Sequence, residues 1–155
     1  MLADHVIGTW RLVSFTAEYT ERPGIIHPLG HDAVGIIMYT ADGYMSAQIM
    51  RPGRQDYDLL DRDGGDRGDL EQAAAAATGY LAYSGRYTVD ESARTLHHHV
   101  EVSLLPAWLD TVQIREATLD GARLTLAADD PFPGGTVHSV LVWERPAAHR
   151  PETEV

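Results

Sequence analysis

The chain has 155 residues, 44% of them hydrophobic, which is the size and composition of one globular domain with a core of its own. Its formal net charge is -11 at pH 7, which disfavours nucleic acids and anionic membrane surfaces as partners because both need clustered Lys and Arg. It contains no cysteine, which excludes disulfides and thiolate chemistry and agrees with a cytoplasmic location.

No apolar run approaches the roughly 20 residues that cross a bilayer. The N-terminus also lacks the basic and then apolar segments of a signal peptide. We therefore expect no membrane association and no secretion. We expect one domain over residues 1–146, a frayed tail over residues 147–155, and a monomer or homodimer.

Alternating apolar and polar residues predict about eight strands, over residues 6–19, 34–40, 44–50, 80–89, 95–105, 111–119, 123–127 and 136–145. Arg22-Pro23-Gly24 breaks the first strand, and Asp42-Gly43 and Asp120-Gly121 are hairpin signals. Strands joined by short turns indicate an all-β, antiparallel, up-and-down meander. Such a meander closes most economically into a β-barrel, because closure removes exposed edges.

Residues 51–79 interrupt this meander after the third predicted strand. Their first half is rich in Pro, Gly and Asp, and residues 69–77 predict one short helix. Asp69 is the candidate N-cap, and Gly79 is the candidate glycine just past the helix end. The insertion either covers one mouth of the barrel or is a solvated loop with a packing helix, and the sequence leaves both open.

The two ends of the predicted meander resemble the lipocalin-type barrel: Gly8-Thr9-Trp10 begins the first strand and Arg145 ends the last. In that superfamily the Trp packs across the closed end and the Arg lies over its indole, which implies structural roles for Trp10 and Arg145. Longer segments, such as residues 39–46, 83–87, 98–104 and 141–145, resemble the bacterial lipocalin-like domain family over nearly the whole chain. Some barrels of similar shape fold a reactive polyene or polyketide into a ring. The chain departs from secreted lipocalins in lacking a disulfide, a signal peptide and their Thr-Asp-Tyr motif, which argues against extracellular transport.

Three residues are candidate catalytic groups: His98, Tyr83 and Arg115. Alternation predicts that the inner face of residues 96–105 consists of Leu96, His98, Val100, Val102 and Leu104. An inward His is either a satisfied core group or a donor or general acid/base that acts on a ligand. Tyr83 is expected inside, where its hydroxyl could orient a ligand. Arg115 would pair with a carboxylate or enolate if it faced inward, and would be solvated if it faced outward.

Five further residues are candidates for binding a ligand. They could supply adaptable apolar wall, orienting polar groups or an aromatic ring at the barrel rim, and they are Met38, Ser46, Gln48, Trp108 and Gln113. No metal is expected, because His97 and His99 are predicted to face outward. The acidic residues 61–69 also do not fit the spacing of an EF-hand.

A barrel with a few polar groups inside is typical of a container. We therefore expect a small, mostly hydrophobic molecule to bind in the central cavity, with no cofactor. The alternative is a cofactor-independent cyclase or isomerase acting on a polyketide- or polyene-like intermediate, in which His98, Tyr83 and Arg115 orient or activate the substrate. A third alternative is a haem-binding barrel with His138 or His98 as the ligand.

Overall fold

A computed structural model describes residues 1–57 and 70–148 of the chain. In chain order the elements are α1 (Leu2–Val6), β1 (Gly8–Tyr19), β2 (Arg22–Ile26), β3 (Val34–Tyr39), β4 (Tyr44–Met50), α2 (Leu70–Thr78), β5 (Tyr80–Asp90), β6 (Thr95–Ser103), a 3-10 turn η1 (Pro106–Trp108), β7 (Val112–Asp120), β8 (Arg123–Phe132) and β9 (Gly135–Glu144).

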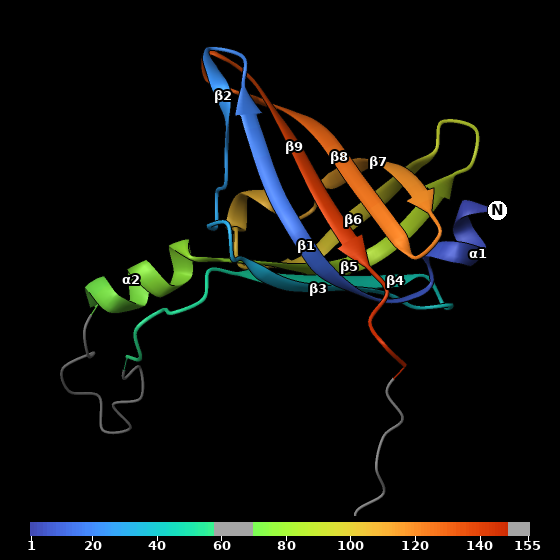
Figure 1. Ribbon diagram of the computed structural model, residues 1–155, viewed down its shortest axis with the longest axis horizontal. Helices are drawn as coiled ribbons and strands as arrows, with labels where there is room; N and C mark the ends of the chain where they lie inside the picture. Colours follow the sequence, from blue (N-terminus) through green and yellow to red (C-terminus); the bar gives the residue numbers. More distant parts are fainter. Residues whose placement is uncertain (58–69, 149–155) are drawn as a thin grey trace, which may run out of the picture.

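The strands form a closed antiparallel barrel, which confirms the predicted architecture (Figure 1). From β3 to β9 each strand pairs with the next, and β1 pairs with both β3 and β9 to close the ring of eight strands. Strand β2 stands outside this ring, because it pairs only with the end of β1. The predicted short helix is present as α2 and follows the strand at residues 44–50.

Two elements were not predicted. The first strand was expected to begin at Val6, but residues 2–6 form the helix α1, whose Leu2 and Val6 are buried in the hydrophobic core. The spacing of four residues puts both side chains on one helical face, which five residues of sequence are too few to reveal. The segment Arg22-Pro23-Gly24, expected to be a break, begins the exposed strand β2.

The alternation in β6 changes partway along the strand, which corrects the predicted inner face. Leu96, His98 and Val100 are buried as expected, but Val102 is 68% exposed and Leu104 is also exposed. The reason is a β-bulge, because Gly85 of β5 pairs with Val100 whereas Ser84 pairs with Val102. A Cβ at Gly85 would collide with the backbone carbonyl oxygen of His99, so the bulge depends on a glycine there.

One end of the barrel is closed by α1 and by a contact between the two chain ends. The guanidinium of Arg145 lies 3.7 Å from the ring centroid of Trp10 and donates a hydrogen bond to the His5 carbonyl. The Trp10 indole N–H donates to the Val6 carbonyl at 2.8 Å. Gly8 has a φ of +114°, and a Cβ there would lie 2.5 Å from the Arg145 guanidinium. The Gly-Thr-Trp segment and Arg145 therefore form a structural closure.

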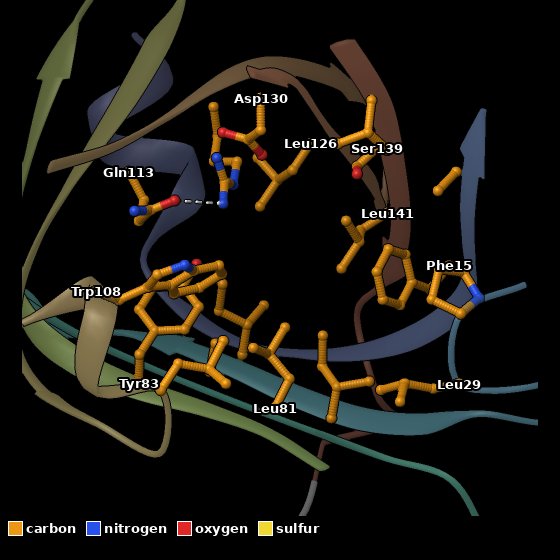
Figure 2. A pocket seen from close by; sticks show the side chains of 18 of the residues that line it. Phe15, Leu29, Leu81, Tyr83, Trp108, Gln113, Leu126, Asp130, Ser139 and Leu141 are labelled. Atoms are coloured by element: carbon orange, nitrogen blue, oxygen red, sulfur yellow. Dashed lines mark hydrogen bonds between the residues drawn. The ribbon is translucent and has the colours of Figure 1, made fainter. Parts of the chain in front are cut away.

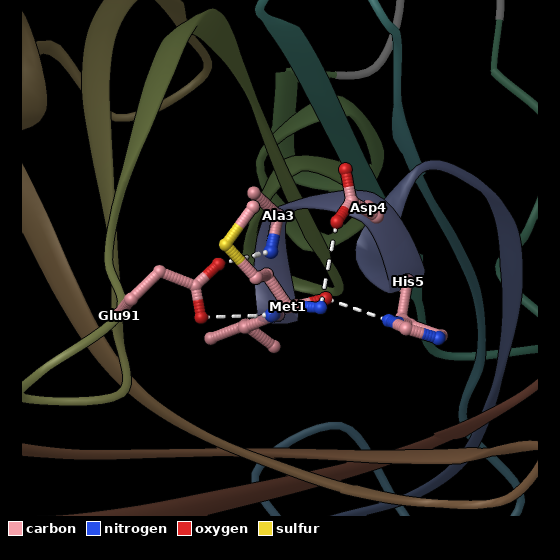
Figure 3. A network of polar contacts seen from close by, with 6 residues as sticks. Met1, Ala3, Asp4, His5 and Glu91 are labelled. Atoms are coloured by element: carbon pink, nitrogen blue, oxygen red, sulfur yellow. Dashed lines mark hydrogen bonds and ion pairs between the residues drawn. The ribbon is translucent and has the colours of Figure 1, made fainter.

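The β5–β6 turn fastens α1 to this closed end (Figure 3). The Glu91 carboxylate accepts hydrogen bonds from the backbone N–H groups of Leu2 and Ala3, both at 2.8 Å. These N–H groups have no partner inside the helix, and the partial positive charge at the helix N-terminus favours a carboxylate there. The two hydrogen bonds lower the pKa of Glu91.

In Figure 1 the helix α2 lies at the left of the barrel, on the opposite side from α1. Its predicted N-cap, Asp69, lies outside the described residues. Gly79 follows the helix as predicted and donates its N–H to the Ala75 carbonyl at 3.1 Å. Its φ is not left-handed, however, and glycine suits this position because a Cβ would lie 3.1 Å from the Arg54 side chain. Both readings of residues 51–79, a cover over the mouth and a solvated loop with a packing helix, stay open, and residues 58–69 lie outside the described residues.

Candidate functional site

The half of the barrel farther from α1 encloses a cavity of about 560 Å³ (Figure 2). Inward residues of β1, β3, β4, β5, β8 and β9 supply its apolar wall, including Phe15, Ile37, Ile49, Leu81, Leu126 and Leu141. Loop residues line its outer part, among them Leu29 and Trp108. A volume of this size is within the range of sites for small molecules and cofactors.

A small group of polar side chains interrupts this apolar wall: Tyr83, Gln113, Arg115, Asp130 and Ser139. Arg115 is 8% exposed, and its guanidinium donates to the Ile114 carbonyl at 2.9 Å and to the Gln113 side-chain oxygen at 3.1 Å. Among residues 1–57 and 70–148, no acidic side chain forms an ion pair with Arg115 within 4.0 Å. In the described part of the chain, this buried positive charge therefore has hydrogen-bond partners that are neutral oxygens and no acidic counter-charge.

His98 is fully buried next to the cavity and joins two tyrosines. Its Nδ1 lies 2.9 Å from the Tyr83 hydroxyl, and its Nε2 lies 2.9 Å from the Tyr39 hydroxyl. Burial lowers the pKa of His98 to about 3, and the nearby positive charge of Arg115 acts in the same direction. The imidazole is therefore neutral at physiological pH.

Both tyrosines are neutral as well. Burial raises the pKa of Tyr39 well above its usual value. Burial also raises the pKa of Tyr83, against the charge and hydrogen bonding of Arg115, which favour the phenolate. The three side chains form a chain of neutral hydrogen-bonding groups that ends at the cavity, because Tyr83 lines the cavity and the other two do not.

Four of the predicted site residues line the cavity: Tyr83, Trp108, Gln113 and Arg115. The Trp108 ring meets the Tyr83 ring edge to face, with centroids 5.2 Å apart and planes at 77°. His98 lies one hydrogen bond behind this wall. The structure therefore brings the three candidate catalytic residues together, although His98 reaches the cavity only through Tyr83. Their chemical roles stay predictions.

Met38, Ser46 and Gln48 do not line the cavity, which corrects the expectation that they face a ligand. The buried residues of β4 are Met45, Ala47 and Ile49, so alternation turns Ser46 and Gln48 to the outer face. There Ser46 accepts a hydrogen bond from the Ser84 hydroxyl at 2.8 Å, and Gln48 accepts one from the Tyr80 hydroxyl at 2.8 Å. Met38 pairs with Ser46 in the sheet and is exposed on the same face.

Strand β7 resolves an ambiguity that its sequence left open. Its polar residues Gln113 and Arg115 face the cavity, whereas Val112 is 46% exposed and Ile114 is 52% exposed. The usual arrangement of a half-buried strand is thus inverted, which is typical of a barrel that uses a few inward polar groups to orient a ligand.

Tyr39 and Asp130 were not predicted to belong to the site. Tyr39 shares the buried face of β3 with Ile37, so the alternating pattern of residues 34–39 could have revealed it. Asp130 belongs to the outer half of β8, which continues to Phe132 rather than ending at residue 127. The Asp-Asp-Pro sequence there resembles a turn, and only pairing with β9 extends the strand.

His97, His99 and His138 lie apart from this site. His97 and His99 contact the hydroxyls of Thr95 and Thr88, respectively. His138 is exposed and pairs with Asp129 at 2.6 Å rather than facing the cavity. Within the described ranges, no group of three or more His, Cys, Asp or Glu side chains is arranged to hold a metal. The acidic residues 61–69 lie outside the described residues.

No helix in the described part of the chain is long and apolar enough to cross a membrane. A family model described as a lipocalin-like domain matches residues 7–146. The chain is also similar to the 4'-hydroxy-3'-methoxypropiophenone carrier protein ppsC of Aspergillus oryzae, with 37% identity over 109 residues that cover 65% of this chain and 96% of the relative. Since the family model spans nearly the whole barrel, this protein belongs to the lipocalin-like domain family.

Proposed function

We propose that this protein binds a small, mostly hydrophobic molecule in its barrel and acts as its carrier. The observation that carries the proposal is the cavity of about 560 Å³, which has apolar walls and lies in the half of the barrel opposite the closing helix. A substituted aromatic molecule placed there would remove apolar surface from water on both sides, at roughly 25 cal/mol per Å² buried.

The proposed ligand class is a substituted aryl ketone. The similar fungal protein bears the name of a carrier for such a molecule, a hydroxy-methoxypropiophenone. The cavity offers matching features, since the edge-to-face pair of Tyr83 and Trp108 presents aromatic surface to its interior. Several aliphatic side chains supply the remaining wall.

The test is a titration of the purified protein with propiophenone, in which binding is measured by calorimetry and by tryptophan fluorescence, to which Trp108 and Trp143 in the cavity wall contribute. We expect saturable binding of one molecule per chain. Leu81→Trp adds an indole inside the cavity and should weaken binding at least about tenfold. Ile114→Trp places the same indole on the outer face and should leave binding unchanged. Failure of propiophenone and of other apolar aromatic probes to bind would refute the proposal.

A second candidate function is the cofactor-independent cyclase or isomerase. The observation that favours it is the placement of Arg115 and Tyr83 on a mostly apolar wall, where they could stabilise a developing enolate. Mass spectrometry of a polyketide-like substrate before and after incubation would detect a cyclised or isomerised product of unchanged mass. A carrier would return the molecule unaltered. The cytoplasmic location and the monomeric or homodimeric state belong to the proposal and are open to direct measurement.

A further inference from the structure

The neutral imidazole of His98 constrains the hydrogens of its two tyrosine neighbours. A neutral imidazole has one N–H donor and one nitrogen acceptor. Because both ring nitrogens lie 2.9 Å from a phenol oxygen, one tyrosine donates to His98 and the other accepts from it. Two arrangements satisfy this rule: the hydrogen bonds are donated from Tyr39 through His98 to Tyr83, or from Tyr83 through His98 to Tyr39.

The surroundings of Tyr39 select one direction. If His98 donated to Tyr39, the Tyr39 hydrogen would be buried without an acceptor, because the described residues offer its hydroxyl no partner besides His98. Such a group costs about 1–3 kcal/mol. In the other arrangement Tyr39 donates to Nε2, and Nδ1–H donates to Tyr83. The Tyr83 hydroxyl hydrogen is then not donated to His98, so it can point into the cavity that Tyr83 lines.

Arg115 provides a second donor in the same cavity. It lines the cavity together with Tyr83, and its positive charge favours the ionised form of the Tyr83 hydroxyl. Its charge is met only by neutral oxygens and by no ion pair within 4.0 Å in the described part of the chain. An anionic ligand oxygen would supply the missing counter-charge through a charge-assisted hydrogen bond.

We propose that the cavity binds its ligand through a phenolate oxygen that accepts hydrogen bonds from the Tyr83 hydroxyl and the Arg115 guanidinium, with Tyr83 oriented by a one-way relay from Tyr39 through His98. This inference rests on the proposed function and narrows the ligand class to acyl phenols. A para-acyl group delocalises the negative charge of a phenolate, so such a phenol ionises more readily than tyrosine.

The charged and titratable groups around the bound oxygen come from five strands. Tyr39 on β3, Tyr83 on β5 and His98 on β6 are neutral, and Arg115 on β7 is positive. Asp130 on β8 lines the same cavity and raises the pKa of Tyr83, so it opposes an anion there. The charge of Arg115 acts on the Tyr83 hydroxyl more strongly than that of Asp130, so its attraction dominates there.

The experiment uses three probes with the full chain: para-hydroxypropiophenone, propiophenone and propylbenzene. The phenolate of the first absorbs at longer wavelength than its phenol, so the spectrum of the bound probe reports its ionisation directly. We expect the bound phenol to ionise at least about one pH unit below the free phenol, which is a tenfold preference for the phenolate. Propylbenzene, which has no oxygen, reports whether the cavity itself is intact.

Four variants test the roles of the residues. Arg115→Gln and Tyr83→Phe should each weaken phenolate binding by roughly tenfold or more and should retain propylbenzene binding. Asp130→Asn should act in the opposite direction and lower the pH of ionisation further. Tyr39→Phe does not touch the cavity, but it should reduce the spectral shift because it removes the constraint on the Tyr83 hydrogen.

The outcomes separate this inference from the proposed function. If propylbenzene binds and the spectrum of bound para-hydroxypropiophenone is that of the neutral phenol, the phenolate site is refuted and the carrier function stands. The inference is also refuted if Arg115→Gln folds and keeps the wild-type spectral shift. If no probe binds to the wild-type protein, the proposed function fails and this inference fails with it. Should Arg115→Gln not fold, the opposite effects of Tyr83→Phe and Asp130→Asn decide.

Discussion

The buried neutral His98 should make the protein lose stability as the pH falls below neutrality. In the unfolded chain His98 has its ordinary pKa of 6.5, whereas burial lowers it to about 3 in the folded protein. At a pH between these two pKa values, His98 binds a proton in the unfolded state but not in the folded state, so protonation favours unfolding. The stabilisation is complete above the unfolded pKa and decreases as the pH falls towards the folded pKa.

The size of the effect follows from these two values. The stability lost is about 1.36 kcal/mol per pH unit once the pH is below 6.5, so the free energy of unfolding should fall by roughly 1 to 2 kcal/mol between about pH 7.5 and about pH 5.5. The full shift amounts to roughly 5 kcal/mol by about pH 3, where Asp90 and Glu91, whose pKa values are also lowered, add to the loss. The range above pH 5.5 isolates His98 from these carboxyls and stays above the pI of about 5.0.

The assay is urea denaturation followed by tryptophan fluorescence at several pH values in this range, on the wild type and on His98→Gln. Glutamine offers a donor and an acceptor but does not titrate, so its curve lacks the contribution of His98. All other ionisable groups are common to both proteins and cancel in the difference. Equal pH dependence in the two proteins would show that His98 is not held neutral by burial, and the reasoning would be wrong.

Three further predictions concern the closed end and the bulge. Arg145→Met should lower the free energy of unfolding by about 1 kcal/mol in denaturant titrations, because the cation–π contact with Trp10 and the hydrogen bond to the first helix are lost. Gly85→Ala should lower it by several kcal/mol, measured by thermal unfolding, because the added Cβ would meet the His99 carbonyl. Glu91→Gln should lower the free energy of unfolding slightly and should speed hydrogen exchange in the first helix, since two amides lose a charged acceptor.

Each of these predictions has a matched comparison. Arg145→Lys keeps a cation but not the flat guanidinium, so it should recover part of the loss. Gly121→Ala adds a methyl group at a turn where nothing lies within 4 Å, so its cost is that of placing alanine at a φ of +58°, about 1 kcal/mol, and it should be smaller than that of Gly85→Ala. Wild-type exchange rates in the first helix of Glu91→Gln would contradict its attachment to the β5–β6 turn. Equal losses in the two glycine variants would contradict the steric argument.

The sequence by itself determined the class of fold and the closure of the barrel. Period-two alternation and Asp-Gly turns are local signals, so they located the barrel strands and their hairpins without tertiary information. The contact between Trp10 and Arg145 was implied by the resemblance of the two chain ends to the lipocalin-type barrel, and the structure contains it. Alternation also placed His98 correctly, since Leu96 and Val100 flank it with apolar residues.

Only the tertiary structure decided which faces of the strands line the cavity. Strand β7 turns its polar side inward and β4 turns its polar side outward, and alternation alone cannot distinguish them because it fixes the period and not the direction. The bulge opposite Gly85 reverses the end of β6 for a similar reason, since a one-residue shift arises from pairing between strands. The hydrogen-bonded chain of Tyr39, His98 and Tyr83 joins three strands. Such a site exists only once the barrel has closed.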